Sequence, residues 1–434
     1  MMNTKKICAD KKYLAVPVWI QNPINAKRED LQILEVWQKE KCLYEYFLPP
    51  VDTAKERPDY YAWLPISVGD DLEIKTELSK PFLDFIHTSK EMLLPQKEQD
   101  SLHYTSPYGF INDPNGLIYK DGIYHLFYQH NPMNNIWENM TWGHAISEDL
   151  LHFTFVGDAL FPDERGVMYS GCAILNERGE FGLPKDALLF FYTSAGGVEL
   201  RGRTHENVFT QRMAYSLDNG KTLIKYEDFE IPHIVGENRD PDVFWHEESQ
   251  AYICVLYLDE KDFVILRSKN LKDWEESQRL SLPPMWECPD LICLKSEGGE
   301  EKWAFLSADG FYYIGSFDGY KFEIEGEMKS LYADKYPYAA QTYSNLPDER
   351  VIQIAWLRTE DEGKVYRGAM GVARELRLAK DAEGWYIHQS FVKEAVEKGY
   401  VKVIDGCQVI RDYDLTEKIS KDGKTLFVEI STKE

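Results

Sequence analysis

Three acidic residues stand beside prolines in short motifs that precede β-patterned segments. Asp113 lies in "FINDPNG", Asp240 in "ENRDPDVFW" and Glu287 in "WECPDL". After each proline come an apolar run, a polar turn and an aromatic residue that opens a second apolar run. The three acids therefore occupy matching points of what we interpret as three copies of one structural unit.

Such a set of carboxylates predicts cleavage of a glycosidic bond. One acid protonates the leaving oxygen, and a second carboxylate attacks the anomeric carbon or activates water. A third can bind sugar hydroxyls and stabilise the developing positive charge. Asp113 lies among Asn112, Asn115 and backbone donors that would keep it ionised, whereas Glu287 follows Trp286 in a less polar setting that suits a general acid. An isolated "NDPNG" is also an ordinary turn sequence, but repetition in register favours function.

The region that must position these acids consists of short strands and turns. From about residue 100 to 378, turn signals such as "YKDGIY", "SLDNGKT" and "FDGYKF" recur, and no helical period persists. Many short strands with a repeat of roughly 40–60 residues predict a β-propeller, and this length accommodates roughly five blades. Because equivalent positions on the innermost strands of a propeller converge on its channel, acids from three blades would meet at one end of it.

The chain divides into three predicted parts: an N-terminal β-rich domain over residues 1–95, a propeller over 96–378 and a short C-terminal β-sheet segment over 379–434. In the first part, "NAKREDLQILEVWQKEK" fits a helix or a strand. A C-terminal segment of about 55 residues makes a marginal core, so we expect it to pack with the N-terminal strands. The predicted fold is all-β, a five-bladed β-propeller with a β-sandwich-like module formed from the N-terminal region and the short C-terminal sheet.

Composition excludes several classes of partner. The 434 residues carry a formal net charge of −24, which argues against nucleic acid, because nucleic-acid binding needs a concentrated basic surface. No apolar run reaches the roughly 18–20 residues of a membrane span and no signal peptide is evident, so we expect a cytoplasmic protein with no membrane partner. The seven cysteines form no zinc-spaced cluster, and we expect reduced thiols, no metal and no cofactor. The oligomeric state stays open.

The acidic motifs resemble those of glycoside hydrolase family 32, the invertases, levanases, inulinases and related β-fructofuranosidases. The family's Trp-Met-Asn-Asp-Pro-Asn-Gly motif is matched by "FINDPNG", its Arg-Asp-Pro by residues 239–241 and its Glu-Cys-Pro by residues 287–289, in family order. The resemblance covers roughly residues 103 to 380. It implies a five-bladed propeller, hydrolysis with retention of configuration and a neutral, fructose-containing saccharide as substrate.

The resemblance also implies a role for each acid. Asp113 would be the nucleophile, Glu287 the general acid/base and Asp240 the transition-state stabiliser that holds fructose hydroxyls. The residues that would line the fructosyl subsite are Asn112, Gln129, Trp137, Ser170 and Arg239.

Some of these subsite residues also have a structural interpretation. Gln129 could make a strand-end turn contact, and Trp137 could simply pack in the core. Arg239 could serve mainly as the ion-pair partner that keeps Asp240 ionised. A residue pair in the segment "WGHA", Trp142 and His144, is expected to belong to the scaffold.

Several positions depart from the family pattern. Phe110-Ile111 replaces Trp-Met and removes an indole from the pocket wall, and Cys172 in "YSGC" stands where a serine hydroxyl is usual. The segment "DKYPYAAQTY" at 334–343 lacks a family glycine. None of these departures removes a catalytic acid, so they bear on the choice of leaving group.

Three alternatives stay open at this point. A family 43-like pentosidase also uses three acids on a propeller, but it inverts, with carboxyls about 6.5–9.5 Å apart in place of about 5–5.5 Å, and the "NDPNG" and "ECP" motifs argue against it. A fructosyltransferase uses the same covalent intermediate as the hydrolase. A non-catalytic fructan-binding paralogue would fit Cys172 and the short C-terminal segment, although the acid trio is intact.

Overall fold

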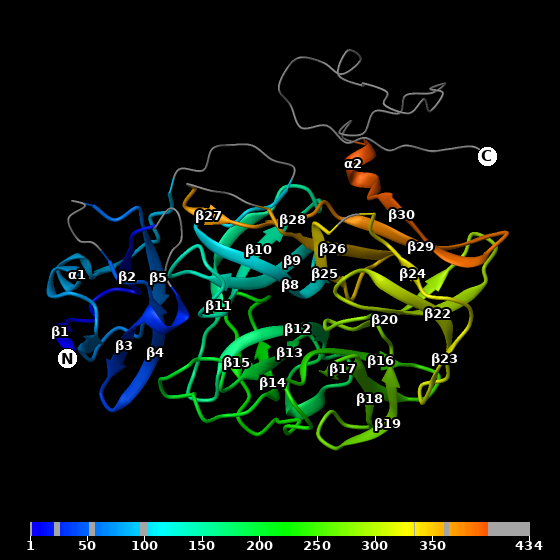
Figure 1. Cartoon of the computed structure of the whole chain (residues 1–434), viewed down its shortest axis with the longest axis horizontal. Coiled ribbons are helices and arrows are strands. Elements are labelled where there is room, and N and C mark those ends of the chain that lie inside the picture. Colours follow the sequence, from blue (N-terminus) through cyan, green and yellow to red (C-terminus); the bar gives the residue numbers. More distant parts are fainter. Residues whose placement is uncertain are drawn as a thin grey trace, which may run out of the picture.

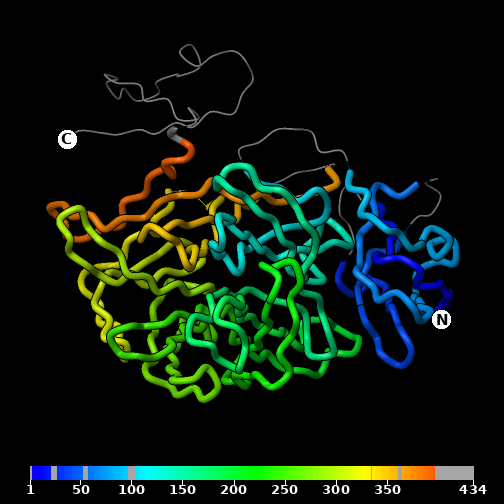
Figure 2. The backbone as a smooth tube through the Cα atoms, turned by 180° about the vertical axis from the view of Figure 1, so that it is seen from behind, coloured from blue at the N-terminus to red at the C-terminus, as the bar shows by residue number. Residues whose placement is uncertain are grey.

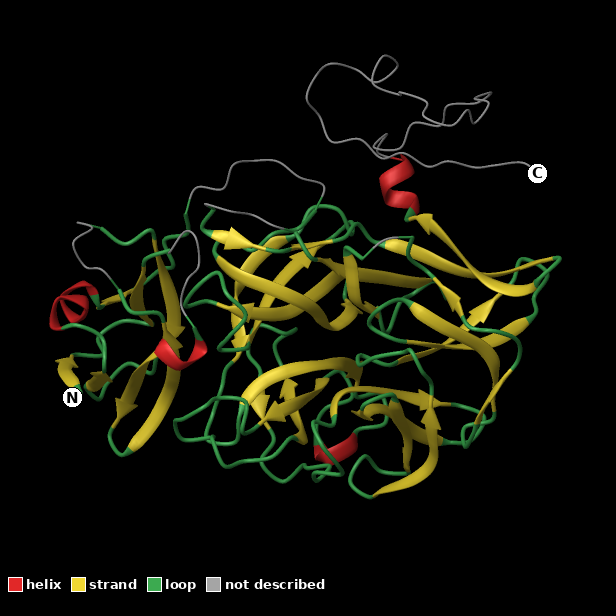
Figure 3. Ribbon diagram, viewed as in Figure 1, coloured by secondary structure: helices red, strands yellow, loops and turns green. Residues whose placement is uncertain are grey.

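The computed structural model describes residues 2–20, 27–51, 57–95, 103–333, 335–359 and 364–397, and its regular elements are almost all β-strands (Figure 3). This confirms the all-β prediction. The helical elements are short: η1 (Arg28–Asp30), α1 (Lys80–Phe85), η2 (Glu180–Gly182) and α2 (Lys393–Glu397). Across those ranges, no helix combines the length and apolarity needed to cross a bilayer.

The N-terminal residues form two small sheets with one core. One sheet has the order β1 (Asn3–Ile7), β6 (Leu72–Thr76), β3 (Gln32–Gln38) and β4 (Lys41–Leu48), and the other has β5 (Tyr60–Pro65), β2 (Tyr13–Val18) and β7 (His87–Ser89). The segment "NAKREDLQILEVWQKEK", for which the sequence left helix and strand open, contains strand β3. Its alternation decides the matter, because Leu34 and Val36 are fully buried on one face while their neighbours in the strand are partly exposed.

Five sheets follow in chain order, and their strands are antiparallel except for β27 (Tyr366–Arg367), which joins the first sheet in parallel (Figure 1). The first contains β8 (Gly109–Lys120), β9 (Ile123–Asn131), β10 (Thr141–Ser147) and β11 (Thr154–Leu160). The second contains β12 (Val167–Leu175), β13 (Leu188–Ala195), β14 (Thr210–Ser216) and β15 (Ile224–Lys225). The third contains β16 (Arg239–His246), β17 (Ala251–Asp259), β18 (Asp262–Ser268) and β19 (Trp274–Ser281).

The fourth and fifth sheets each have five strands. The fourth contains β20 (Asp290–Lys295), β21 (Glu301–Leu306), β22 (Phe311–Phe317), β23 (Phe322–Ile324) and β24 (Lys329–Ser330). The fifth contains β25 (Pro337–Thr342), β26 (Val351–Leu357), β28 (Ala369–Met370), β29 (Arg374–Asp381) and β30 (Gly384–Phe391). The predicted boundary at residue 378 therefore falls inside β29, and the described part of the C-terminal segment continues the fifth sheet. Residues 398–434 lie outside the described residues.

The last sheet lies beside the first, as the view from behind also shows (Figure 2). Strand β27 (Tyr366–Arg367) pairs in parallel with the start of β8, and the Ser344 N–H donates to the Leu117 carbonyl at 3.0 Å. Apolar side chains fill the spaces between consecutive sheets. Phe127 and Trp142 of the first sheet, for example, share a cluster with Phe190 of the second.

Local sequence accounts for the hairpins that build these sheets. Asp121 and Gly122 form the predicted turn between β8 and β9, with φ values of 52° and 86° and Lys120 paired with Ile123. Two residues with positive φ give the turn whose twist matches the flanking strands. The second strand of a sheet is covered on both faces, which explains why all eight residues of β13 are buried.

The N-terminal sheets dock against the first two of the five sheets. Tyr60 stacks on Tyr108 with ring centroids 5.0 Å apart, and the amide of Asn139 forms two hydrogen bonds with the backbone of Phe47. The Phe47 N–H donates to Asn139 Oδ1 at 2.7 Å, and Asn139 Nδ2 donates to the Phe47 carbonyl at 2.8 Å. Because Asn139 is buried, this joint excludes water.

We expect Asn139→Ala to lower the free energy of unfolding, because it leaves two buried backbone groups of Phe47 without partners. Each such group costs roughly 1–3 kcal/mol, so the loss should be about 2–6 kcal/mol in urea unfolding. Asn219→Ala is the matched control, since Asn219 has a similar φ of 57° but is exposed. Equal losses in the two variants would show that backbone strain, and not the joint, causes the effect.

Candidate active site

The first strand of four of the five sheets contains a β-bulge. The register shifts between Ile111 and Pro114 in β8, Met168 and Gly171 in β12, Arg239 and Asp242 in β16, and Tyr338 and Gln341 in β25. A bulge places an extra residue on one strand and redirects its side chains. Asp113, Ser170 and Asp240 lie within these bulges, and Glu287 lies three positions before Asp290, the first residue of the fourth sheet. The strands thus bring the three predicted acids together.

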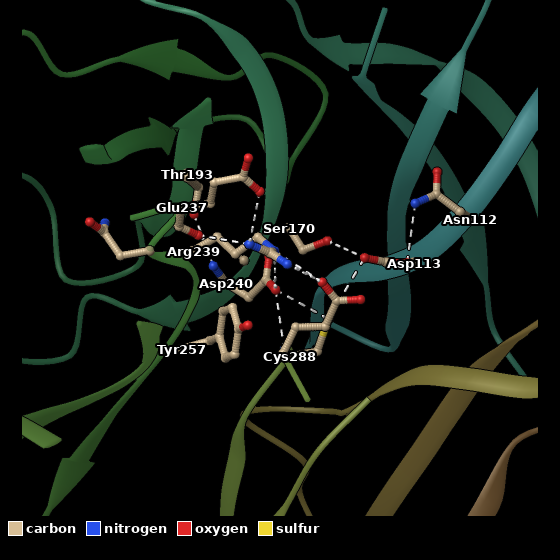
Figure 4. Close-up of polar contacts among 12 residues, drawn as sticks. Asn112, Asp113, Ser170, Thr193, Glu237, Arg239, Asp240, Tyr257 and Cys288 are labelled. Carbon is tan, nitrogen blue, oxygen red and sulfur yellow. Dashed lines mark hydrogen bonds and ion pairs between the residues drawn. The ribbon is translucent and has the colours of Figure 1, made fainter. Parts of the chain in front are cut away.

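Asp113 is held by two donors from its own and the next sheet. Ser170 Oγ donates to Asp113 Oδ2 at 2.6 Å, and Asn112 Nδ2 donates to Oδ1 at 3.1 Å (Figure 4). Burial and the charge of Glu287 nevertheless raise the pKa of Asp113 to about 6, although the Ser170 and Asn112 hydrogen bonds oppose the rise. The expected donors are present, but desolvation outweighs them, and a pKa of about 6 still leaves Asp113 mostly ionised at pH 7.

Asp240 sits on a strained backbone that a neighbouring sheet supports. Its φ is 63°, and its N–H donates to Thr193 Oγ1 at 2.9 Å. Its carboxylate accepts from the Cys288 N–H at 3.1 Å and lies 3.8 Å from Arg239 Nε. Burial raises the pKa of Asp240 to about 7 against the influence of Arg239, and the charges of Glu287 and Asp113 add to the rise. Arg239 therefore lowers this pKa without holding it in its usual range.

Both carboxylate oxygens of Glu287 accept hydrogen bonds. Arg239 donates to Oε2 through Nε at 3.0 Å and Nη2 at 2.7 Å, and the Tyr338 hydroxyl donates to Oε1 at 2.6 Å. The less polar setting expected for Glu287 is therefore wrong, since the polar partners come from other sheets. Arg239 is fixed in turn over the ring of Tyr257, 4.7 Å from its centroid. The guanidinium spans Glu287 and Asp240 and orients both.

Cys288 links the two aspartates. Its Sγ lies 3.4 Å from Asp240 Oδ2 and 3.8 Å from Asp113 Oδ2 (Figure 4). Burial and the neighbouring carboxylates raise the pKa of this thiol well above its ordinary value. Residues 287 and 288 have φ values of 32° and 43°, which non-glycine residues seldom adopt and which often mark functional sites.

Sequence reasoning missed three members of this cluster: Thr193, Cys288 and Tyr338. Cys288 lies inside a motif that had been identified, so its position was a usable signal. Thr193 stands in a continuous apolar strand and Tyr338 in a tyrosine-rich segment, where nothing distinguishes them from structural residues. Only the pairing of the sheets places these two hydroxyls against Asp240 and Glu287.

Two predicted subsite residues, Gln129 and Trp137, make no direct hydrogen bond to the acids in the described contacts. Gln129 is buried at the end of β9, and the oxygen of the Asn115 amide accepts from its N–H at 3.0 Å and its Nε2 at 2.9 Å. In this orientation Asn115 donates to Ser170 Oγ at 3.2 Å, so Gln129 reaches Asp113 through Asn115 and Ser170. Trp137 lies between β9 and β10 with 40% exposure, which does not fit simple packing in the core.

Trp142 and His144 are part of the scaffold, as expected. Both are buried, His144 stacks on Phe127 at 4.0 Å, and Trp142 Nε1 donates to the Tyr169 carbonyl at 3.0 Å. Cys172 is buried between sheets, where its sulfur accepts from the Val243 N–H at 3.0 Å. The missing serine hydroxyl is thus replaced by a thiol that makes a structural contact.

A cavity of about 290 Å³ is lined in part by Asp242 and Asp290. Burial raises the pKa of both carboxyls, that of Asp290 to about 6. Thr342 donates to both oxygens of Asp290, at 3.0 and 3.2 Å. Over the described ranges, no three His, Cys, Asp or Glu side chains are grouped so that they could hold a metal ion.

Comparisons with known proteins place this arrangement in context. Residues 103–390 match the family model described as "Glycosyl hydrolases family 32 N-terminal domain". The chain is 32% identical over 324 residues to a levanase of Bacillus subtilis, covering 67% of this chain and 46% of the relative. It is 33% identical over 336 residues to an extracellular exo-inulinase of Aspergillus niger, covering 65% and 62% respectively. The chain thus spans about half to two thirds of the length of these relatives.

Solved structures that resemble this chain include an exo-inulinase and a fructofuranosidase. The exo-inulinase of Aspergillus awamori superposes with a TM-score of 0.61 at 29% identity, covering 69% of this chain and 68% of that one. A fructofuranosidase of Schwanniomyces occidentalis, solved in complex with fructose, gives a TM-score of 0.58 at 28% identity over 67% and 62% of the two chains. Both matches leave roughly a third of this chain outside the superposition.

The position of Cys288 between carboxylates predicts slow alkylation. Because thiolate is the reactive species, iodoacetamide at pH 8 should label the exposed Cys8 quickly and Cys288 slowly, as followed by peptide mass spectrometry. Asp240→Asn removes a negative charge 3.4 Å from the sulfur and should speed labelling of Cys288. The exposed Asp71→Asn is the control. Labelling of Cys288 as fast as Cys8 in the unmodified protein would contradict this description of the site.

Proposed function

Because the chain belongs to glycoside hydrolase family 32, we propose that it hydrolyses β-fructofuranosyl bonds and releases fructose from sucrose, fructo-oligosaccharides or fructans. The observation that carries this proposal is the cluster in which Asp113, Asp240 and Glu287, from three sheets, are joined through Arg239 and Cys288. A retaining glycosidase needs two carboxyl groups flanking the bond and stabilisation of positive charge at the anomeric carbon.

The contacts favour a division of labour between the acids. Asp113, oriented by Ser170 and Asn112, would attack the anomeric carbon while Glu287 passes a proton to the leaving oxygen. The carbon–oxygen bond breaks and a fructosyl ester of Asp113 forms. Glu287 would then take a proton from water, whose oxygen attacks the same carbon, so that fructose leaves with its configuration retained and Asp113 is freed.

Asp240 would act without bonding to the sugar carbon. Held by the Cys288 N–H and Arg239, its carboxylate would accept hydrogen bonds from fructose hydroxyls and stabilise the oxocarbenium-like charge. Arg239 and Tyr338 fix both oxygens of Glu287, which keeps the acid in place for both proton transfers. The substrate would be a neutral saccharide, and the chemistry needs no metal or cofactor.

We further propose that the five sheets are the blades of a five-bladed propeller. Support comes from their chain order, from the pairing of β27 with β8 that joins the last part of the chain to the first sheet, and from bulges at equivalent points of the first strands. The β-sandwich-like module of N-terminal and C-terminal strands stays a prediction, because residues 398–434 lie outside the described residues. A cytoplasmic location likewise stays a prediction.

A product screen tests the proposed function directly. The full chain is incubated with sucrose, sucrose phosphate, kestose, inulin and levan, and the products are separated by chromatography. Release of free fructose from at least one saccharide supports the proposal. Fructosyl transfer to sugar in preference to water would identify a transferase, and binding with no product would identify a non-catalytic paralogue.

Glu287→Gln should lower kcat/KM on the best substrate by about 10²–10⁴-fold, the usual contribution of a general acid/base. Asp113→Asn should lower it at least as far, because no covalent intermediate can form. The controls are Glu301→Gln and Asp262→Asn, which make the same changes at exposed positions in β21 and β18. Near wild-type fructose release by either site variant would overturn the assigned roles.

The raised pKa values of Asp113 and Asp240 predict an acidic limb of activity. Asp113 must be ionised to attack, so kcat/KM should fall as the pH drops through about 7 to 6, where these carboxylates gain protons. Ser170→Ala removes a hydrogen bond that lowers the pKa of Asp113, so its limb should move to higher pH. A limb that moves to lower pH in this variant would contradict the proposed electrostatics.

A further inference from the structure

The N-terminal domain contacts one loop of the first of the five sheets and one loop of the second. One loop joins β9 to β10 and carries Trp137 and Asn139, and the other joins β13 to β14 and carries Glu199 and Arg201. Arg201 pairs with Glu77 through two bonds of 2.6 and 2.7 Å and also donates to the Leu31 carbonyl. Both loops are thus fixed by partners from residues 28–77, outside the five sheets.

Arg28 of η1 binds Glu138, the residue that follows Trp137 in the sequence. Its Nε donates to Glu138 Oε1 at 2.6 Å and its Nη2 to Oε2 at 3.1 Å, a bidentate pair with the residue next to Trp137. The guanidinium carbon lies 5.6 Å from the centroid of the Trp137 ring, within the range of a cation–π interaction. Arg28 therefore holds this tryptophan through its neighbour and through its ring.

Arg28 supplies the positive charge beside two buried carboxylates, those of Glu138 and Glu199. Glu138 and Glu199 have side chains only 7% and 4% exposed, and Arg28 Nη2 lies 4.0 Å from Glu199 Oε2. Burial and the charge of Glu138 raise the pKa of Glu199 to about 7 even with Arg28 in place. Without the guanidinium, two buried acids would face each other unpaired, and the loop that carries Glu138 would have to move.

Trp137 connects this ion pair to the catalytic cluster. Its ring meets that of Tyr169 edge-on, with centroids 5.9 Å apart. Tyr169 is the neighbour of Ser170, which donates to Asp113. The remaining surface of Trp137 is open, and an exposed aromatic ring at the rim of a saccharide site offers a flat apolar face to a sugar ring.

We propose that Arg28 is a positioning residue for Trp137, and that the N-terminal domain thereby forms part of the saccharide-binding wall of the active site. This inference rests on the proposed fructosidase function and assigns a role to residues that lie before the family-matched region. Arg28 does not touch the reacting atoms. It acts on substrate binding through the orientation of Trp137.

The test compares Arg28→Gln, Arg28→Lys and Arg279→Gln. Arg279 is the matched control, because it forms a bidentate pair with Glu276 at 2.9 Å on an exposed strand. Arg28→Gln should raise KM for sucrose or kestose by about three- to tenfold, the worth of an aromatic contact, and change kcat less than about twofold. Arg28→Lys, which keeps the charge without the fork, should restore part of the affinity, and Arg279→Gln should behave like the wild type.

A double-mutant cycle separates positioning from general destabilisation. If Arg28 acts through Trp137, adding Arg28→Gln to Trp137→Ala should change KM no further. Additive effects on KM, or an unchanged KM in Arg28→Gln, would overturn the proposal.

A second readout does not depend on activity. The difference in acrylamide quenching between the wild type and Trp137→Phe reports the exposure of Trp137. The same difference, measured with and without Trp137→Phe in each arginine variant, should change in Arg28→Gln but not in Arg279→Gln. If the wild type releases no fructose from any saccharide, the proposed function fails while this measurement still judges the position of Trp137. An unchanged difference in Arg28→Gln overturns the positioning role.

Discussion

The site depends on β-bulges in the first strands of successive sheets. A regular strand would pair every residue with its neighbour, and the bulge instead leaves Asp113, Ser170 and Asp240 free to face one another. This geometry has an energetic cost, because a left-handed backbone at a residue such as Asp240 costs about 1–3 kcal/mol. Contacts between sheets offset it, above all the hydrogen bond from the Asp240 N–H to Thr193.

The second constraint is electrostatic. Asp240 and Glu287 share one guanidinium, that of Arg239, and Asp113 feels the charge of Glu287, so the negative charges exceed the positive charge beside them. The pKa values of Asp113 and Asp240 rise to about 6 and 7 as a result. In the proposed mechanism Asp113 must be ionised to attack, so its raised pKa limits the pH range of activity, while the polar partners of Glu287 hold that carboxylate in a fixed orientation. Backbone strain and unbalanced charge therefore occur at the same place, the cluster of three acids.

The N-terminal domain adds contacts that the five sheets cannot supply to themselves. Its backbone meets the amide of Asn139, and its Arg28 pairs with Glu138, so the loop between β9 and β10 is held from outside. A loop with an exposed aromatic residue would otherwise sample many positions, and ordering it before the ligand arrives lowers the entropic cost of binding. The two parts of the chain therefore meet at the loop that carries Trp137.

The sequence by itself determined the three acidic motifs, their family and the all-β character, because residue type, turn-forming pairs such as Asp121-Gly122 and strand alternation are local properties. Only the tertiary structure decided which groups surround the acids. Tyr338 donates to Glu287 from 51 positions away, and Arg28 reaches Glu138 across 110. The pKa of Asp113 also depends on the fold, because the donor beside it in sequence lowers this pKa while burial and the charge of Glu287 raise it. Desolvation and charge–charge distance depend on sheet packing, and no stretch of sequence encodes that packing alone.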